Sequence, residues 1–353
     1  MKKYIGIIGG NGFVGKNVVL TLQVLDKNKR ILVATRKKNS NEVLDPNIEY
    51  TYLDINNKEQ LELFCSKCST IINCTGPSFI IEDKISKACL NTKTNYVEVS
   101  GDSGLYNRLK TFDEIFYDKK LNCIHSSGVN PGLVEALTNL CIIKYADTET
   151  IEVYFAGTGE LSHNAAIDMI ESCKSPYNRG ITFLEDGEYS RVTNFEYSKV
   201  LPEPSGKVFC VPIISDHFAR CIQEGKIKKA FFYNVFKTTS TISVMFDAAN
   251  HGANLTVEDL SVKLRNSFLE EKLLYNMEFT AIYFVIHSKE LLIKKMVYYG
   301  NWNELTGIVA AIVAVGIEEG KIRRYGVGEI WNSLNMEWFY EKIATIKKLE
   351  VDL

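Results

Sequence analysis

The chain has 353 residues, more than one hydrophobic core usually serves, so we expect two domains. Its 46% hydrophobic and 24% charged residues are ordinary globular values, and a net charge of −2 offers no positive field for nucleic acid or a membrane surface. Nine scattered cysteines, an odd number, favour reduced thiols in a cytoplasmic protein over a disulfide framework. Cys65 and Cys68 form a CxxC pair that no second pair or histidine cluster accompanies, so we expect no metal.

The first 145 residues alternate short apolar runs with segments of helical period, which is the pattern of repeated βαβ units and a parallel sheet. Between the first two runs, apolar residues from Phe13 to Leu25 recur at helical spacing. The expected strands are Lys3–Ile8, Arg30–Thr35, Ile48–Leu53, Thr70–Cys74, Tyr96–Ser100 and Asn122–Ser126.

After about residue 147 the apolar runs become longer and few helices are expected between them. The clearest loop is Leu201–Gly206. Near the end the pattern turns helical again, at Asn303–Glu319 and Met336–Lys348, and the apolar run 307–317 is too short for a membrane span of about 20 residues. The expected strands are Ile151–Phe155, Val208–Ile214, Ala230–Lys237, Thr241–Phe246 and Phe279–Ser288.

These patterns predict an α/β fold in two domains. Residues 1–132 would form a Rossmann-type, doubly wound parallel sheet, and residues 133–302 a second α+β domain built on a mainly antiparallel sheet. The helices of residues 303–353 could pack back on the first domain.

The motif that carries the chemistry is a glycine-rich turn between the first strand and the first helix. It satisfies G-x-G-x-x-G in the context that the dinucleotide-binding fingerprint requires. Glycines let the backbone approach a pyrophosphate, whose charge meets free N–H groups at the positive end of the helix dipole. The residues assigned to this turn are Gly9, Gly10, Asn11, Gly12, Phe13, Val14 and Gly15.

The second strand ends in Arg36 and Lys37, where an NAD site would place a carboxylate for the ribose hydroxyls. A cationic cluster there suits a 2′-phosphate and predicts NADP(H), although an exposed basic turn is the alternative. Asp54, after the third strand, could accept a hydrogen bond from adenine or cap an Asn56–Cys65 helix. The fourth strand leads into Cys74, Thr75, Gly76 and Pro77, expected to contact the nicotinamide half of the cofactor.

With these residues in hand, the chain resembles the saccharopine dehydrogenase family, whose NADP-binding domain precedes a substrate domain. The likeness covers the first 145 residues well and the rest thinly, and Gly328-Glu329 stands where the family often has Pro-Glu. We also assign Gly128 to the cofactor site. The matching stretches are GGNGFVG at 9–15, INCTGP at 72–77, ACLNTKTNYVEVSGD at 88–102 and SSGVNPGL at 126–133.

The resemblance implies hydride transfer to or from the carbon of a C–N bond, that is, imine reduction or secondary amine oxidation. It implies a small-molecule amine or imine as the substrate, free or carrier-bound, and leaves a homodimer open. A trans-acting enoyl reductase on carrier-bound acyl chains and a non-catalytic NADP-sensing protein are the rival hypotheses.

Imine reduction needs a carboxylate or similar group to stabilise the iminium and a proton donor within reach. Glu98 and Asp102 lie at the end of the fifth strand and are the catalytic candidates. The alternative is that Glu98 pairs with a cation and Asp102 caps the following helix.

Substrate contacts are expected in four places. Backbone N–H groups around Asn130 could face a substrate carboxylate or belong to a plain hinge. His163 and Asn164 follow a glycine pair and would face the cleft if the second domain follows the family, and Arg179 could bind a carboxylate. His125 lies in an apolar strand and is expected to be a core histidine.

Overall fold

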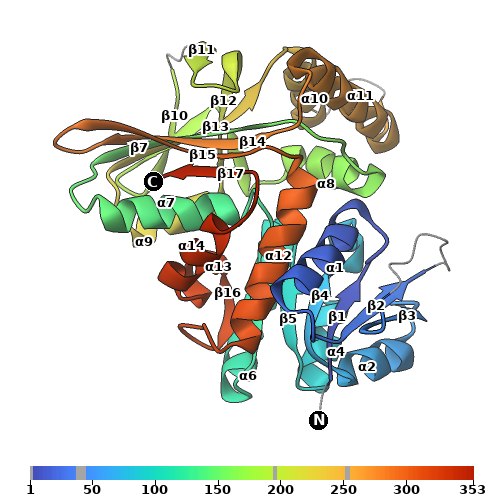
Figure 1. Cartoon of the computed structure of the whole chain (residues 1–353). Coiled ribbons are helices and arrows are strands. Elements are labelled where there is room, and N and C mark those ends of the chain that lie inside the picture. Colours follow the sequence, from blue (N-terminus) through green and yellow to red (C-terminus); the bar gives the residue numbers. More distant parts are fainter. Residues whose placement is uncertain (1–2, 37–44, 194–196, 251–254) are drawn as a thin grey trace. The chain divides into compact units, whose positions relative to one another are not determined.

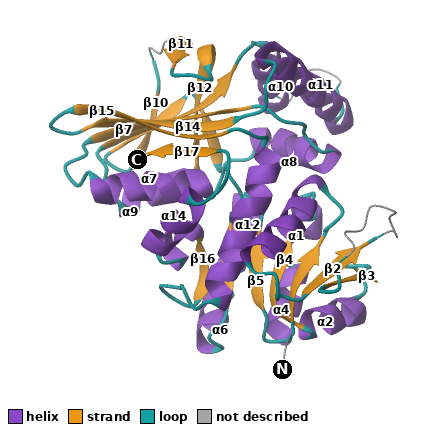
Figure 2. Ribbon diagram, viewed as in Figure 1, coloured by secondary structure: helices purple, strands orange, loops and turns teal. Residues whose placement is uncertain are grey.

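The computed structural model describes residues 3–36, 45–193, 197–250 and 255–353. It divides the chain into two compact units, shown in Figures 1 and 2, each of which is described by itself. Unit 1 comprises residues 1–133 and 303–343, and unit 2 comprises residues 134–302 and 344–353. The chain therefore leaves unit 1 after residue 133, returns to it at residue 303, and ends in unit 2, so the last ten residues of the segment expected to pack on the first domain belong to the second unit.

Unit 1 is built on a seven-stranded sheet whose neighbouring strands all pair in parallel. The strand order is β16-β6-β5-β4-β1-β2-β3, so the direction of winding reverses between β1 and β4. This reversal confirms the doubly wound sheet and marks the edge where such sheets bind ligands. The strands are β1 (Tyr4–Ile8), β2 (Ile31–Thr35), β3 (Ile48–Tyr52), β4 (Cys68–Asn73), β5 (Asn95–Glu98), β6 (Asn122–His125) and β16 (Gly326–Glu329).

Helices cover both faces of this sheet (Figure 1). On one face, buried residues of the strands join Leu61, Ile85, Leu105 and Phe116 of four different helices in a single apolar cluster. On the other face, α1 begins over the sheet where Gly10 meets Val33. The helices of unit 1 are α1 (Phe13–Leu25), α2 (Lys58–Ser66), α3 (Ser78–Ile81), α4 (Lys84–Asn91), α5 (Ser103–Lys110), α6 (Asp113–Asp118), α12 (Trp302–Glu318), α13 (Ile330–Ser333) and α14 (Met336–Ala344).

Helix α12 accounts for the late apolar run of the sequence, because nearly every residue from Leu305 to Ile317 is buried. It packs on α1 at Gly307, where an added Cβ would lie 2.6 Å from Asn17 Cβ and 2.9 Å from the carbonyl oxygen of Val14. The predicted buried helix is thereby confirmed. Strand β16 follows it and extends the sheet beside β6.

Unit 2 is built on a ten-stranded sheet in which β7 and β13 pair in parallel and the other described strand pairs are antiparallel. This confirms the mainly antiparallel second sheet. The loop predicted at Leu201–Gly206 closes the β11–β12 hairpin. The strands are β7 (Thr150–Gly157), β8 (Asn178–Gly180), β9 (Thr182–Glu185), β10 (Glu188–Arg191), β11 (Ser198–Leu201), β12 (Gly206–Ser215), β13 (Lys229–Phe236), β14 (Thr280–His287), β15 (Leu291–Tyr298) and β17 (Leu349–Asp352).

Helices are more numerous in unit 2 than the sequence suggested, and one expected strand is wrong. Thr241–Phe246 lies within α10, whose buried residues Thr241, Val244 and Ala248 follow helical spacing. Val244 and Ala248 join an apolar cluster with α8, α11 and β12, so packing on neighbouring helices decided the conformation. The helices are α7 (Leu133–Lys144), α8 (His163–Lys174), α9 (Asp216–Glu224), α10 (Ser240–Ala249) and α11 (Val257–Tyr275).

The CxxC cysteines belong to the core of unit 1. Cys65 and Cys68 are buried, and the Cys89 thiol lies 3.9 Å from Cys65 Sγ. Within the described ranges, no cluster of three or more histidine, cysteine or acidic side chains could hold a metal ion. In the same ranges, the helices are too short or too polar to span a membrane.

Candidate nucleotide and acid–base site

The glycine-rich turn joins the end of β1 to α1 and leaves the first helical N–H groups available. Gly9 has a φ of 84°, and its carbonyl accepts the N–H of Gly12 at 3.0 Å. Gly12 is the N-cap residue of α1, with no side chain to occupy the helix N-terminus, and no acidic residue lies in the first turn. Such a terminus offers N–H groups and a positive dipole end to an anion.

Close packing explains three of the glycines and links the turn to β4. An added Cβ on Gly9 would lie 2.7 Å from Thr75 Cγ2 and 2.9 Å from the Cys74 carbonyl oxygen. A Cβ on Gly10 would lie 2.2 Å from Val33, and one on Gly15 would lie 2.3 Å from the Gly9 carbonyl oxygen. The structure therefore brings the predicted phosphate-binding turn and the residues after β4 together at the point where the winding reverses.

The residues predicted to select NADP(H) lie at the ends of β2 and β3. Arg36 directly follows β2 and is exposed, whereas Lys37 lies outside the described residues. Asp54 is exposed, and its Oδ1 accepts the N–H of Asn56 at 3.0 Å. Helix α2 is capped instead by Asn57, whose side chain accepts the N–H of Gln60, so capping by Asp54 is wrong. Its contact with adenine stays a prediction.

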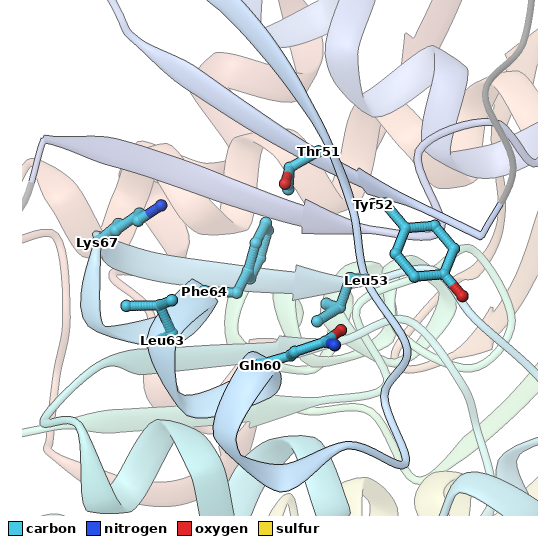
Figure 3. Close-up of a pocket in the computed structure, with 7 residues that line it drawn as sticks. All are labelled: Thr51, Tyr52, Leu53, Gln60, Leu63, Phe64 and Lys67. Atoms are coloured by element: carbon cyan, nitrogen blue, oxygen red, sulfur yellow. The ribbon is translucent and has the colours of Figure 1, made fainter.

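A cavity of about 200 Å³ lies beside the edge strand β3 (Figure 3). It adjoins Asp54, because Leu53 lines it and the Gln60 side chain in its wall accepts the Asp54 N–H at 3.4 Å. The sequence offered no signal for it, since its wall mixes exposed and buried positions of α2. The lining residues are Thr51, Tyr52, Leu53, Gln60, Leu63, Phe64 and Lys67.

The loop after β4 is held by Asn73, the last residue of that strand. Its Oδ1 accepts the N–H of Thr75 at 3.0 Å and the Thr75 hydroxyl at 2.5 Å, which folds the loop of Cys74, Thr75, Gly76 and Pro77 over the strand end. Burial raises the pKa of the Cys74 thiol far above its ordinary value, so this thiol is neutral. The loop therefore presents uncharged groups.

Glu98, the last residue of β5, is buried and held by three donors. Its Oε1 accepts the N–H of Ser100 at 2.9 Å, and its Oε2 accepts the Asn73 amide at 2.8 Å and the Tyr96 hydroxyl. Only 1% of the residue is exposed. Burial, with the nearby Glu98 carboxylate, raises the pKa of Tyr96 well above its usual range. Glu98 is therefore buried below the surface of the candidate site, and its carboxylate is hydrogen-bonded within the protein.

Asp102 differs from Glu98 because it is half-buried and begins a helix. Its Oδ1 accepts the N–H groups of Gly104 and Leu105, at 2.7 and 3.1 Å, which makes it the N-cap of α5. Its Oδ2 lies 3.3 Å from the Ser78 hydroxyl, and its own N–H donates to Ser100 Oγ at 3.2 Å. The alternative prediction, that Asp102 caps the following helix, is therefore correct. Because Oδ1 does the capping, Oδ2 is directed at the Ser78 hydroxyl.

The segment after β6 comes close to the Glu98–Asp102 loop. An added Cβ on Gly101 would lie 2.2 Å from Pro131 Cδ, and one on Gly128 would lie 3.3 Å from the Val99 carbonyl oxygen. Asn130 is exposed, and α7 begins three residues later, after Gly132 with a φ of 132°. Gly128 and Asn130 therefore flank the loop that carries Asp102, and their ligand contacts stay predictions.

The other predicted substrate residues belong to unit 2. His163 and Asn164 are the first two residues of α8, after the N-cap residue Ser162. The Nε2 atom of His163 lies 3.6 Å from the Glu258 carboxylate.

Arg179, on β8, stacks on the Tyr189 ring at 3.5 Å and lies 3.9 Å from Asp216. Burial and a 2.9 Å hydrogen bond to Asp216 raise the pKa of Tyr189 to about 12. Arg179 is thus already engaged within unit 2, and its binding of substrate stays a prediction.

Sequence reasoning missed the partners of Glu98, namely Asn73 and Tyr96. It also missed that His125 and Glu329 lie in register with them on neighbouring strands. The available signal was a polar residue closing each of several apolar strands. The pairing itself joins residues far apart in the sequence and could not be inferred.

A glycine-rich turn at the switch point of a doubly wound sheet is the arrangement found in dinucleotide-binding folds. Residues 5–123 match the family model described as the saccharopine dehydrogenase NADP binding domain. The N-terminal part of the chain is therefore similar to the NADP-binding domain of saccharopine dehydrogenases, and the prediction of NADP(H) as the cofactor is confirmed.

Solved structures show the same fold over the whole chain. A saccharopine dehydrogenase (L-Glu forming) from Saccharomyces cerevisiae is similar with a TM-score of 0.69 and 12% identity, covering 99% of each chain. A DAP dehydrogenase of C. glutamicum, in complex with DAP, is similar with a TM-score of 0.51 and 10% identity, covering 98% of this chain and 99% of that one. Sequence comparison with curated proteins found no match.

Proposed function

We propose that this protein is an NADP(H)-dependent oxidoreductase that transfers a hydride to or from the carbon of a C–N bond, reducing an imine or oxidising a secondary amine. The observation that carries the proposal is the Asp102 carboxylate, fixed by α5 beside the loop after β4, with Oδ2 directed at Ser78. The names of the two structural relatives, a saccharopine and a DAP dehydrogenase, are consistent with amine chemistry.

The residues present fit the cofactor. Gly12 leaves room at the helix N-terminus for the backbone to approach a pyrophosphate, and Arg36 places a cation after β2. Gly9 packs against Cys74 and Thr75 after β4, and Gly15 packs against the carbonyl oxygen of Gly9 within the turn. NADPH supplies the hydride when it is bound.

Asp102 would serve the reaction through its charge and its proton. A carboxylate near an iminium stabilises the positive charge that makes the carbon electrophilic, and its oxygen can hold a proton for the nitrogen. Two backbone N–H groups fix Oδ1, so the side chain cannot rotate freely while Oδ2 acts. Asn130, exposed after β6, is the group that we propose for a substrate carboxylate.

A substrate screen tests the reaction class. Purified protein with NADPH is mixed with pairs of α-keto acids and amines, and nicotinamide oxidation is followed by absorbance. Enoyl thioesters are tested in parallel. Turnover of a keto acid with an amine, and not of either alone, supports the proposal. Turnover of enoyl thioesters alone would replace it with enoyl reduction, and tight NADPH binding without turnover of any substrate would replace it with NADP sensing.

The role of Asp102 is tested by Asp102→Asn. Asparagine caps helices as well as aspartate does, so the unfolding midpoint should stay the same. Loss of the charge and the proton should lower kcat by about 10²–10⁴-fold, as for a general acid or base. Asp118→Asn, an exposed carboxylate at the end of α6, is the matched control and should keep full activity. Unchanged kcat in Asp102→Asn would remove Asp102 from the mechanism.

A further inference from the structure

The sheet of unit 2 carries a row of apolar side chains across five of its strands. Ile293 of β15 pairs with Val285 of β14, which pairs in turn with Glu152 of β7. Beyond Glu152 comes Phe231 of β13, whose ring stacks on Phe183 of β9 with 4.8 Å between the ring centroids. Residues opposite one another on paired strands share a face of the sheet. These four apolar side chains, with Glu152 among them, form what we call the apolar row.

The same strands are buried on their other face. Helix α9 packs there, and its Phe218 ring lies 5.3 Å from the ring of Phe232 on β13 (Figure 1). Side chains alternate along a strand, so the neighbours of the apolar row on its own strands point to this helix-covered face. These neighbours pair across β14, β7, β13 and β9 and are each 0% exposed: Ile286, Ile151, Ala230 and Leu184.

On the face of the apolar row, the β11–β12 hairpin covers a row of tyrosines. Ser205 Oγ lies 2.8 Å from the Tyr283 hydroxyl, and the Lys199 ammonium donates to the Tyr154 hydroxyl. Both tyrosines are 1% exposed. Two positions away on the same strands, Ile293 of the apolar row is 56% exposed and its other apolar side chains are partly exposed. Since the open face of an antiparallel sheet is usually polar, an apolar one indicates an interaction surface.

The charges on this face are balanced. Glu152, the acid within the row, lies 3.1 Å from His287 Nε2 in addition to its lysine partner, so the row would bury no bare charge. A balanced face does not repel a copy of itself, whereas nucleic acid or an anionic membrane is attracted by net positive charge. The ion pairs are Lys199 with Glu152 at 3.5 Å, Lys229 with Glu185 at 3.2 Å and Lys295 with Glu350 at 2.7 Å.

The size of the face fits a small dimer interface. On β15 the face includes Leu291, which is 61% exposed, Ile293 and Lys295. Five strands spaced about 4.8 Å apart, and three alternate residues spaced about 6.8 Å apart, outline an area of about 24 by 20 Å. Two such faces together amount to about 1,000 Å², the lower limit of a specific interface.

We propose that two copies of this chain associate through the apolar row, in an isologous dimer whose two sheets pack face to face. In such a dimer the same patch of each copy meets the other, so the patch must be complementary to itself. An apolar row with balanced charges around it meets that condition. The partner would then cover this part of the sheet as the hairpin covers the tyrosines. The inference concerns assembly and does not depend on the reaction.

Sedimentation velocity of the full chain over a concentration series tests the association. We expect a reversible equilibrium between monomer and dimer, because the interface is near the lower size limit. Ile293→Lys places a charge in the row and should raise the dissociation constant by about tenfold or more. Leu273→Lys, at an 80% exposed position of α11 outside the row, is the matched control and should leave the dissociation constant unchanged.

The unfolding midpoint of the dilute protein separates association from folding. Ile293 is more than half exposed, so Ile293→Lys should keep the midpoint measured below the dissociation constant. If this variant does not fold, Leu291→Lys takes its place. A chain that stays monomeric at about 100 µM, above the micromolar range of specific interfaces, would overturn the inference. A dimer with an unchanged dissociation constant in the lysine variant would do so too, since it would form through another surface.

The two proposals can fail separately. A dimer that the lysine variant weakens, without turnover of any imine, would remove the proposed function and leave the interface standing. Imine turnover by a chain that stays monomeric would do the reverse.

Discussion

Gly15→Ala is the sharpest perturbation of the nucleotide site. An alanine Cβ at this position would lie 2.3 Å from the Gly9 carbonyl oxygen and 2.7 Å from Gly10 Cα. Both atoms belong to the backbone, so the turn itself must move. Overpacking of this kind costs about 1–3 kcal/mol, while alanine regains up to about 1 kcal/mol of helix propensity. We expect a net loss of about 1 kcal/mol, which corresponds to a midpoint lower by about 2–4 °C.

Gly12→Ala is the matched control, because it separates packing from ligand binding. Gly12 is exposed, with a φ of −74°, and an added Cβ meets the Gly9 carbonyl oxygen at 3.3 Å. The free protein should therefore keep its unfolding midpoint. The second glycine of this motif lets the backbone approach a pyrophosphate, so NADPH binding should weaken by roughly tenfold or more, about 1.4 kcal/mol per factor of ten.

Differential scanning calorimetry of the free protein and titration calorimetry with NADPH measure the two effects. Gly15→Ala should lower both stability and affinity, and Gly12→Ala affinity alone. Equal midpoints for Gly15→Ala and the unmodified protein would refute the packing argument. Unchanged NADPH affinity in Gly12→Ala would refute the placement of the pyrophosphate at this helix start.

Three further predictions follow from the structure. Arg36→Gln should raise the KM for NADPH by about 10–100-fold, through loss of a charged hydrogen bond, and leave that for NADH nearly unchanged; equal effects would contradict a 2′-phosphate contact. Gly101→Ala, whose Cβ would lie 2.2 Å from Pro131 Cδ, should lower the unfolding midpoint, while Gly180→Ala, with no described heavy atom within 4 Å, should not. Burial raises the pKa of the Glu271 carboxyl above 4.5, outweighing its hydrogen bonds from Lys237 and Thr238. The folded state therefore holds that proton more tightly, and the stabilisation is complete below pH 4.5 and lost as the pH rises through the folded pKa. In urea titrations the stability of the unmodified protein relative to Glu271→Gln should fall as the pH rises above 4.5, and a constant or rising difference would argue against this sign.

Local patterns were enough to predict much of unit 1. The alternation of apolar runs and helical segments located its first six strands within a few residues, because each buried parallel strand is a short apolar run bounded by polar turns. The glycine motif could be interpreted from its context between β1 and α1. Strand β16 was not predicted, since its four residues contain two glycines and pair with β6 from about 200 positions away.

Unit 2 shows where local patterns stop being sufficient. Thr241–Phe246 is rich in β-branched and aromatic residues and yet forms a helix, because its buried side chains fit between α8 and α11. A short apolar run does not by itself distinguish a strand from a buried helix. In the candidate site, Glu98 was predicted from its place at a strand end. The hydrogen bonds that Glu98 accepts from Asn73 and Tyr96 depend on the pairing of strands and could not be predicted.

The return of the chain to unit 1 has a consequence for synthesis on the ribosome. When residues 1–133 emerge, the outer edge of β6 has no neighbour, and the surface of α1 that later receives Gly307 is bare. Gly307 lies 174 residues beyond residue 133 (307 − 133), and β16 begins 193 residues beyond it (326 − 133), so both stay uncovered until these residues have been translated. An open strand edge and an uncovered apolar surface are the features that invite wrong association. Unit 1 therefore cannot complete its fold until residues 303–343 have been synthesised. A chain truncated after residue 302 should be insoluble when it is expressed.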